Sequence, residues 1–119
     1  MPLVSLIYAS SAVKRMSQEE LLAILEKSRE NNEKRNITGM LLYKDGNFLQ
    51  VLEGEDTAVT DLYYAITKDE RHTDLQLLLK REITKRTFSD WEMGFINLEE
   101  VHHVPVVFGM TALFPKFAF

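Results

Sequence analysis

Residues 37–55, ITGMLLYKDGNFLQVLEGE, decide the fold of this chain. The stretch contains two apolar runs, ITGMLLY at 37–43 and NFLQVLE at 47–53, joined through Lys-Asp-Gly at 44–46. Asp-Gly between apolar runs is typical of a tight hairpin turn, because both residues tolerate positive φ angles. The sequence therefore predicts two antiparallel strands in this stretch.

The second strand of this hairpin is apolar on both faces. Strand alternation places Phe48, Gln50 and Leu52 on one face. Leu49 and Val51 then lie on the other face, so we expect this strand in the middle of a sheet, with Gln50 buried. A buried amide without partners costs about 1–3 kcal/mol, so Gln50 should be hydrogen-bonded. It is either a structural glutamine or an amide that contacts a polar ligand.

A strand and a helix are predicted upstream of the hairpin. Residues 3–9, LVSLIYA, form a short apolar run followed by two serines, which is typical of a strand. Ser17 and Glu20 have the spacing of a capping box, so a helix is expected to begin there. Its inner stripe consists of Leu21, Leu25, Ser28 and Asn32. Since a plain core would prefer carbon at the last two positions, the pattern indicates a polar ligand against this helix.

Downstream of the hairpin the sequence predicts a second helix and two more strands. The helix is expected to be capped by Asp56 or Thr57. A polar loop at 69–72 leads to a strand within 74–84, and a last strand follows at 91–97. The order β-α-β-β-α-β-β predicts an α+β domain with a ferredoxin-like fold, in which one sheet carries two helices on a single face. The inner stripe of the second helix consists of Val59, Leu62, Tyr63 and Ile66.

A C-terminal extension, residues 98–119, follows the predicted domain of residues 1–97. It contains four phenylalanines, at positions 108, 114, 117 and 119. Apolar side chains at that density do not stay exposed to water. We expect the extension to cover the sheet face that the helices leave open, or to form an oligomer contact.

The composition limits the classes of function. The chain has 119 residues, of which 45% are hydrophobic and 27% charged, which fits one globular domain. It contains no cysteine, which excludes disulfides, thiolate metal sites and cysteine nucleophiles. A net charge of −4 repels phosphate backbones, so no nucleic acid is expected as a partner. No apolar run approaches the roughly 20 residues that span a membrane, and the N-terminus lacks the basic region of a signal peptide, so we expect a soluble cytoplasmic protein.

Three side chains have both a structural and a functional explanation. Tyr8 is either a core ring or a hydroxyl group that meets Gln50 or a ligand. Asn31 and Asn32 fit the end of a helix, where asparagine tolerates left-handed geometry. Asn32 also lies on the inner stripe of that helix, which favours a contact with a polar ligand.

Two further groups of polar residues are candidates for binding a ligand or a metal. Arg71 and His72 are typical of a solvated loop, and with Asp69 they would also suit the edge of a ligand pocket. His102 and His103 are adjacent, and no third ligand at zinc spacing accompanies them. No metal site is expected.

Five segments of the chain resemble the BLUF family of flavin-binding blue-light photoreceptors. These segments are SLIYAS (5–10), ITGMLLY (37–43), GNFLQVLEGE (46–55), DERH (69–72) and WEMGF (91–95). The similarity extends from about Leu3 to Asn97. The combination of GNFLQVLEGE with an upstream tyrosine and a downstream Trp-x-Met is specific, and no position that defines the family departs from it. The resemblance implies a sensor and not an enzyme.

The resemblance also implies a ligand and the residues that hold it. The ligand is a flavin, usually FAD and alternatively FMN or riboflavin, with its ring between the two helices. Tyr8 and Gln50 are implied as the photoactive pair. Asn32 is implied as the anchor of the polar pyrimidine edge of the ring. Further ring contacts are implied at Ser28, Asn31, Arg71 and His72.

By the same resemblance, light changes the hydrogen bonding of the flavin and leaves the flavin itself chemically unchanged. A phenol can give both an electron and a proton, and a glutamine amide suits the relay because it has a donor end and an acceptor end. Trp91 and Met93 are implied as the pair near Gln50 that changes with the light state. Since the chain offers no room for an effector domain, residues 98–119 are expected to signal to a separate protein partner or to another subunit of a homo-oligomer.

Three other classes of protein share parts of this pattern. A light-independent small-molecule-binding domain of the same topology would lack the yellow colour of a flavoprotein. An acylphosphatase-type hydrolase needs groups preorganised around an anion after the first strand. The stretch 10–16 offers Lys14 and Arg15 there but no glycine-rich cradle. A nucleic-acid-binding sheet is disfavoured by the negative charge.

Overall fold

The computed structural model describes residues 2–14, 16–88 and 93–97. Seven elements follow one another in the order β-α-β-β-α-β-β, as predicted. They are β1 (Leu3–Ala12), α1 (Gln18–Arg35), β2 (Thr38–Lys44), β3 (Asn47–Glu55), α2 (Asp56–Thr67), β4 (His72–Glu82) and β5 (Gly94–Asn97).

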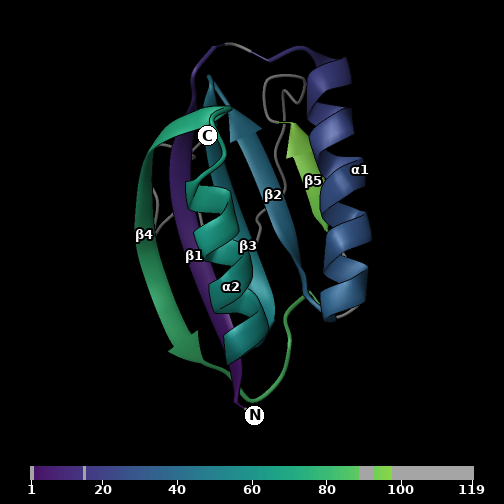
Figure 1. The fold of residues 1–119 in the computed structure, drawn as a ribbon, viewed down its shortest axis with the longest axis vertical. Coiled ribbons are helices and arrows are strands. Elements are labelled where there is room, and N and C mark those ends of the chain that lie inside the picture. Colours follow the sequence, from purple (N-terminus) through teal and green to yellow (C-terminus); the bar gives the residue numbers. More distant parts are fainter. Residues whose placement is uncertain (1, 15, 89–92, 98–119) are drawn as a thin grey trace.

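The strands form one sheet in the order β4-β1-β3-β2-β5, with both helices on the same face (Figure 1). The pairs β1–β3, β1–β4 and β2–β3 are antiparallel, whereas β5 runs parallel to β2. The ferredoxin-like α+β prediction is confirmed. The prediction that the strand containing Gln50 is central is confirmed as well, because β3 lies in the middle of the sheet.

Local chemistry fixes the ends of the hairpin and of the first helix. Asp45 and Gly46 have φ angles of 51° and 77°, the left-handed geometry that a two-residue hairpin turn requires. Ser17 and Glu20 form the predicted capping box of α1. The helix ends at Asn36, which has a φ angle of 54°, so an asparagine takes the position that often belongs to glycine.

Several predicted element boundaries differ from the structure. The N-cap of α2 is Glu55, which makes no side-chain cap hydrogen bond, so the prediction of Asp56 or Thr57 was wrong. Asp56 is instead the first helical residue, and its carboxylate pairs with Lys80 at 2.8 Å. β4 begins at His72, two residues earlier than predicted, because His72 pairs with Ala12 of β1. The described part of the last strand begins at Gly94, and positions 91 and 92 lie outside the described residues.

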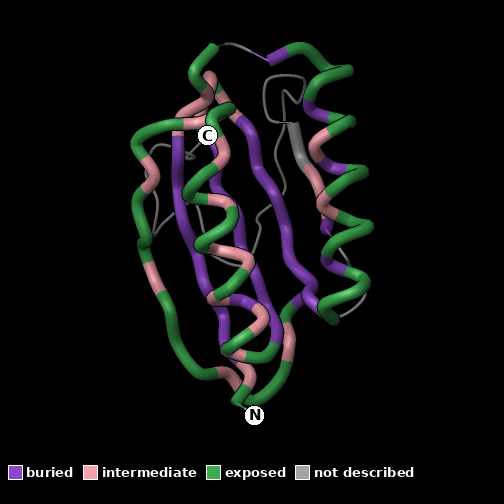
Figure 2. The backbone as a smooth tube through the Cα atoms, viewed as in Figure 1, coloured by how far each residue is buried: buried purple, intermediate pink, exposed green. Residues whose placement is uncertain are grey.

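The sheet has a hydrophobic cluster on each face, and its central strands are the most deeply buried part of the molecule (Figure 2). The cluster under the helices includes Phe48 and Leu52 of β3. The cluster on the opposite face includes Leu49 and Val51, as strand alternation predicts. Residues 98–119, expected to cover that second face or to form an oligomer contact, lie outside the described residues.

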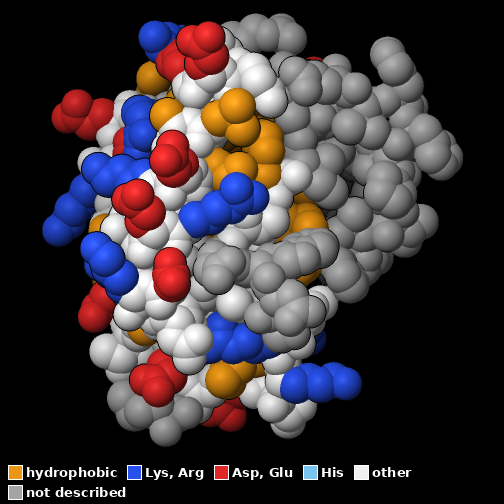
Figure 3. Space-filling model, turned by 90° about the vertical axis from the view of Figure 1, so that its right-hand side faces the viewer, with side chains coloured by type: hydrophobic (Ala, Val, Ile, Leu, Met, Phe, Trp, Pro, Cys, Tyr) orange, Lys and Arg blue, Asp and Glu red, His pale blue; other side chains and the backbone are white. Residues whose placement is uncertain are grey.

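The side of the molecule that carries α1 presents acidic and basic side chains close together (Figure 3). Both signs occur along the helix itself, with Glu19 and Glu20 in its first turn and Lys34 and Arg35 in its last. This arrangement complements the helix dipole. Neither described helix has the length and apolarity that crossing a membrane requires.

Candidate functional site

Tyr8 and Gln50 meet in the middle of the sheet. The two residues are direct partners in the β1–β3 register. Both are buried, with 4% and 5% of their surface exposed. The Tyr8 hydroxyl group donates a hydrogen bond to Oε1 of Gln50, and Nε2 of Gln50 lies 3.4 Å from the sulfur of Met93. Both ends of the Gln50 amide therefore have a partner.

Burial keeps the Tyr8 phenol protonated. Its pKa is raised well above the ordinary value, mainly because burial disfavours the phenolate, with smaller contributions from the nearby Asp69 and Tyr63. The Tyr63 ring lies 5.8 Å from the Tyr8 ring, measured between centroids. Tyr8 thus holds its proton at neutral pH while donating it in a hydrogen bond to an acceptor that is itself buried.

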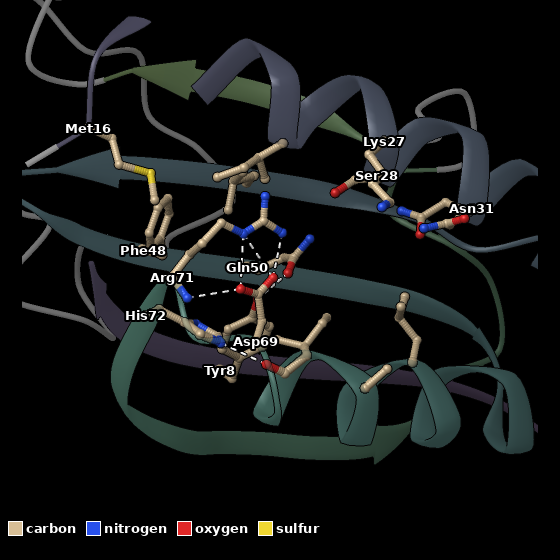
Figure 4. A pocket seen from close by; sticks show the side chains of 16 residues that line it. Tyr8, Met16, Lys27, Ser28, Asn31, Phe48, Gln50, Asp69, Arg71 and His72 are labelled. Atoms are coloured by element: carbon tan, nitrogen blue, oxygen red, sulfur yellow. Dashed lines mark hydrogen bonds and ion pairs between the residues drawn. The ribbon is translucent and has the colours of Figure 1, made fainter. Parts of the chain in front are cut away.

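A cavity of about 270 Å³ opens between the two helices and the sheet, with Tyr8 and Gln50 on its floor (Figure 4). The helix α1 and the helix α2 form its two walls. Its lining from the sheet and the loops consists of Tyr8, Met16, Leu41, Phe48, Gln50, Asp69, Arg71 and His72. Its lining from the helices consists of Ile24, Lys27, Ser28, Asn31, Asn32, Leu62, Ala65 and Ile66.

The α1 wall carries the polar residues predicted from its inner stripe. Asn32 is 1% exposed although it belongs to a surface helix, and Ser28, one turn earlier, is half-buried. Asn31 lines the cavity from a more exposed position. The backbone carbonyl of Asn32 accepts from the N–H of Ile37, which fixes the end of the helix. The polar wall is therefore anchored at the point where α1 turns into β2.

Asp69, Arg71 and His72 line the other end of the cavity (Figure 4). Nε of Arg71 donates to both carboxylate oxygens of Asp69, at 2.9 and 3.0 Å. Hydrogen bonds from Arg71 lower the pKa of Asp69 to about 2, although partial burial opposes the shift. The ion pair holds the loop in one conformation and leaves Arg71 partly exposed at the mouth of the cavity.

The ring of His72 is fixed from both sides. Its Nε2 lies 2.7 Å from the carbonyl oxygen of Ile66, and its Nδ1 lies 2.9 Å from the hydroxyl group of Ser10. Because a carbonyl oxygen can only accept, Nε2 carries a proton. The imidazole stands edge-on to the Tyr8 ring, with 6.4 Å between the centroids. His72 thus joins α2 to β1 beside the phenol.

Of the two residues implied to change with light, the structure describes only Met93. It is 1% exposed, and besides its sulfur contact with Gln50 its backbone carbonyl accepts from Nε of Arg29 at 3.1 Å. Trp91 lies outside the described residues, as do His102 and His103. Phe95, two residues after Met93, packs against the cluster beneath the helices. Within the described part of the chain, no group of three or more acidic or histidine side chains could hold a metal ion.

Several residues of the cavity were not predicted as binding residues. Phe48 and Ile24 could have been found, because they lie two residues before Gln50 on the same strand face and one helical turn before Ser28. Met16 and Lys27 carry no such signal in the sequence. Arg29 contacts Met93 across 64 positions of sequence, which no local pattern encodes.

The cavity suits a flat, mainly apolar ring with one polar edge. Its walls offer carbon and sulfur from Met16, Phe48 and Ile66, and amides from Asn31 and Asn32 at one end. Its volume is near the lower end of the range for small-molecule pockets, about 300–1,000 Å³. These residues fit the ring system of a flavin, which has an apolar benzenoid end and a polar pyrimidine end.

Comparisons with known proteins agree with this site. Residues 3–94 match the model of the BLUF family, sensors of blue light using FAD. A photoactivated adenylate cyclase subunit beta from Euglena gracilis is 38% identical over 92 residues, which are 76% of this chain and 11% of that protein. The structure of a bacterial light-regulated adenylyl cyclase is 38% identical, with a TM-score of 0.85, and the match covers 96% of this chain and 33% of that one.

A smaller relative matches over most of its length. The dark-state structure of BlrB, a BLUF protein, has a TM-score of 0.79 at 32% identity, covering 97% of this chain and 80% of that one. The chain described here belongs to the BLUF family of flavin-binding blue-light sensors. The matched region, residues 3–94, is a sensor domain, as the resemblance implied. The chain spans only about a tenth of the length of the curated cyclase subunit it matches.

Proposed function

We propose that Tyr8 and Gln50 are the photoactive pair of this sensor. The observation that carries the proposal is their buried hydrogen bond at the floor of a cavity that fits a flavin ring. A bound flavin supplies the absorption of blue light and, while excited, the capacity to accept an electron. The residues of the chain supply the electron, the proton and the rearrangement that outlasts the excitation.

Tyr8 is suited to be the donor because its phenol can release an electron and a proton together. Burial keeps the proton on Oη in the resting state, since the pKa of Tyr8 is raised. Oε1 of Gln50 accepts from this hydroxyl group and is positioned to take the proton first. When the electron and the proton return to Tyr8, Gln50 has turned over or changed its tautomer, so the pattern of hydrogen-bond donors and acceptors that it presents has changed.

Six residues are proposed to hold the ring. Asn32 is buried in the α1 wall and is assigned to the polar pyrimidine edge. Because all these residues address the ring that flavins share, they do not distinguish FAD from FMN or riboflavin. We propose FAD, which the family description supports. The proposed ring contacts are Ser28, Asn31, Asn32, Gln50, Arg71 and His72.

Met93 and Trp91 are proposed to transmit the state of Gln50. Met93 is suited to this role because its sulfur already contacts the Gln50 amide and its flexible side chain repacks easily. The sensor domain is proposed to span residues 1–97. Residues 98–119 are proposed to carry the change to a protein partner or to a second subunit. A cytoplasmic location and a homo-oligomeric state are part of the same proposal.

A dark-minus-light absorption spectrum of the purified protein tests this function. The protein should be yellow, release its flavin on denaturation, and show a reversible red shift after blue light. A Gln50→Leu variant should still bind flavin and lose the shift. A colourless protein after reconstitution with flavin would favour a light-independent binding domain, and a full red shift in Gln50→Leu would rule out the relay.

A further inference from the structure

Glu53 is a buried carboxylate on β3 that the proposed relay does not use. It is 1% exposed, and it lies three residues after Gln50, so the two side chains point to opposite faces of the sheet. A buried charge is costly unless it is hydrogen-bonded. One oxygen of Glu53 accepts from the backbone N–H of Thr87 at 2.9 Å, and the other accepts from that of Phe88 at 2.8 Å. The chain after β4 is therefore pinned to the central strand.

Arg86 holds the same segment through its side chain. The guanidinium group donates to the carbonyl oxygen of Glu53 at 2.9 Å and to the hydroxyl group of Thr38 at 2.8 Å. It also donates to the carbonyl oxygen of Asn36 at 2.7 Å. Asn36 is the C-cap of α1, where the backbone carbonyls carry partial negative charge and favour a cation. Arg86 thus joins the end of α1 and the beginning of β2 to β3.

Met93 is held at the far end of the same connection. Its sulfur contacts the Gln50 amide and its carbonyl accepts from Arg29 of α1. Residues 89–92, which follow the Glu53 contacts in sequence, therefore connect two fixed points. They include Trp91, the single tryptophan of the chain. Met93 follows Phe88 by only five positions, so a shift of the chain at Phe88 can reach Met93.

We propose that Glu53 and Arg86 form a clamp that positions Met93 against Gln50 and thereby sets the rate at which the relay returns to its resting state. The inference rests on the proposed function, in which Gln50 rearranges in light. Gln50 and Glu53 belong to one strand, so the responding amide and the anchor of the connection that leads to Met93 share a rigid element. Loosening the clamp at Thr87 and Phe88 relaxes the hold on Met93, which follows Phe88 by five positions, and Met93 then leaves and regains its place over a lower barrier.

The dark recovery of a Glu53→Gln variant tests the clamp. The side chains have nearly the same shape, but the amide nitrogen cannot accept a hydrogen bond from the backbone. We expect the red shift to keep its size and to decay about tenfold faster, which corresponds to about 1.4 kcal/mol in the barrier. Glu82→Gln makes the same change at an exposed position of β4 and should recover at the wild-type rate. Recovery of folded Glu53→Gln that is unchanged or slower would overturn the proposal.

A double-mutant cycle separates the clamp from a general loss of rigidity. If Glu53 acts through Met93, Glu53→Gln should no longer alter the recovery rate when Met93→Ala is already present. The same acceleration in both backgrounds would show that Glu53 acts elsewhere, and the proposal would then be wrong.

The flavin-free protein provides a readout that needs no photochemistry. The backbone amides of Thr87 and Phe88, which donate to Glu53, should exchange their protons with solvent faster in Glu53→Gln and in Arg86→Lys than in the wild type. Arg81→Lys, at an exposed position of β4, is the control for the arginine change. If Glu53→Gln does not fold, Arg86→Lys provides the same test of the clamp. Wild-type protein without a red shift would refute the proposed function, whereas a normal red shift with unchanged recovery and unchanged amide exchange in both variants would refute the clamp alone.

Discussion

Tyr8 and Gln50 are 42 positions apart in sequence and directly opposite in the β1–β3 register, and their side chains share a hydrogen bond. Opposite residues of an antiparallel pair have their Cβ atoms about 4.5–5.5 Å apart on the same face of the sheet. The contact between the phenol and the amide is therefore fixed by strand pairing. A slip of one residue would move one partner to the opposite face.

Tyr8→Phe should abolish the light response and preserve the fold. The phenyl ring keeps the packing of the buried position, but the donor to Oε1 of Gln50 is lost, at a cost of about 1–3 kcal/mol in unfolding free energy. Absorption spectra should show bound flavin and no red shift. Tyr64→Phe, at a position 60% exposed, is the matched control and should respond normally. A red shift of wild-type size in Tyr8→Phe would contradict the assignment of Tyr8.

Asn32→Ala should weaken flavin binding more than Asn31→Ala does. Asn32 is fully buried in the α1 wall, whereas Asn31 lines the same cavity from an exposed position. Losing buried hydrogen bonds of about 1.4 kcal/mol or more would reduce affinity about tenfold. Titration of the flavin-free variants with flavin, followed by fluorescence quenching, measures both dissociation constants. Equal losses in the two variants would show that burial does not decide which asparagine anchors the ring.

Met93→Leu should change the light response with little effect on stability. The exchange conserves volume and costs less than about 1.5 kcal/mol, but it removes the sulfur that lies against Nε2 of Gln50. We expect urea unfolding near the wild-type midpoint together with an altered red shift or recovery rate. Spectra and recovery rates indistinguishable from the wild type would remove Met93 from the signalling path.

The Asp69–Arg71 ion pair should contribute to stability in a defined pH range. The folded-state pKa of Asp69 is lowered to about 2, compared with about 3.9 for an unfolded aspartate. The folded state therefore favours the carboxylate, so the contribution is fully present above about pH 4 and is lost as the pH falls toward about 2. Solvent exposure of the pair keeps the contribution small.

Acid unfolding of Asp69→Asn tests whether the stabilisation by the Asp69–Arg71 ion pair decreases as the pH falls. The difference in stability between the variant and the wild type should shrink as the pH falls from about 4 to about 2. Asp74→Asn, which removes an exposed carboxylate from β4, is the control for the loss of a charge. A difference that grows on acidification would contradict the lowered pKa of Asp69.

Much of the fold could be predicted because its determinants are local. The capping box of Ser17 and Glu20 and the turn at Asp45 and Gly46 involve residues at most three positions apart. Their side chains and backbone angles decide the structure before any packing occurs. Strand alternation likewise predicted that Gln50 would be buried. The N-cap of α2 was predicted at the wrong residue because Asp56 pairs with Lys80 of β4, a partner that no local sequence pattern predicts.

Predicting the site required the sequence motifs, and describing its contacts required the tertiary structure. The motif around Gln50, with Tyr8 upstream, identified the family and pointed to a flavin and to the proposed photoactive pair. The sequence did not show that Arg29 holds the carbonyl of Met93 or that Glu53 pins the backbone at Thr87 and Phe88. Those contacts join residues 34 to 64 positions apart.

By itself, then, the sequence determined the order of the elements, the burial of the Gln50 amide and the family. Each of these follows from short motifs and from the spacing of apolar residues. Only the tertiary structure decided that β5 runs parallel to β2 and that a buried carboxylate anchors the connection leading to it. The reason is physical: periodicity reports which face of an element is buried, whereas a contact between distant segments depends on how the whole chain packs.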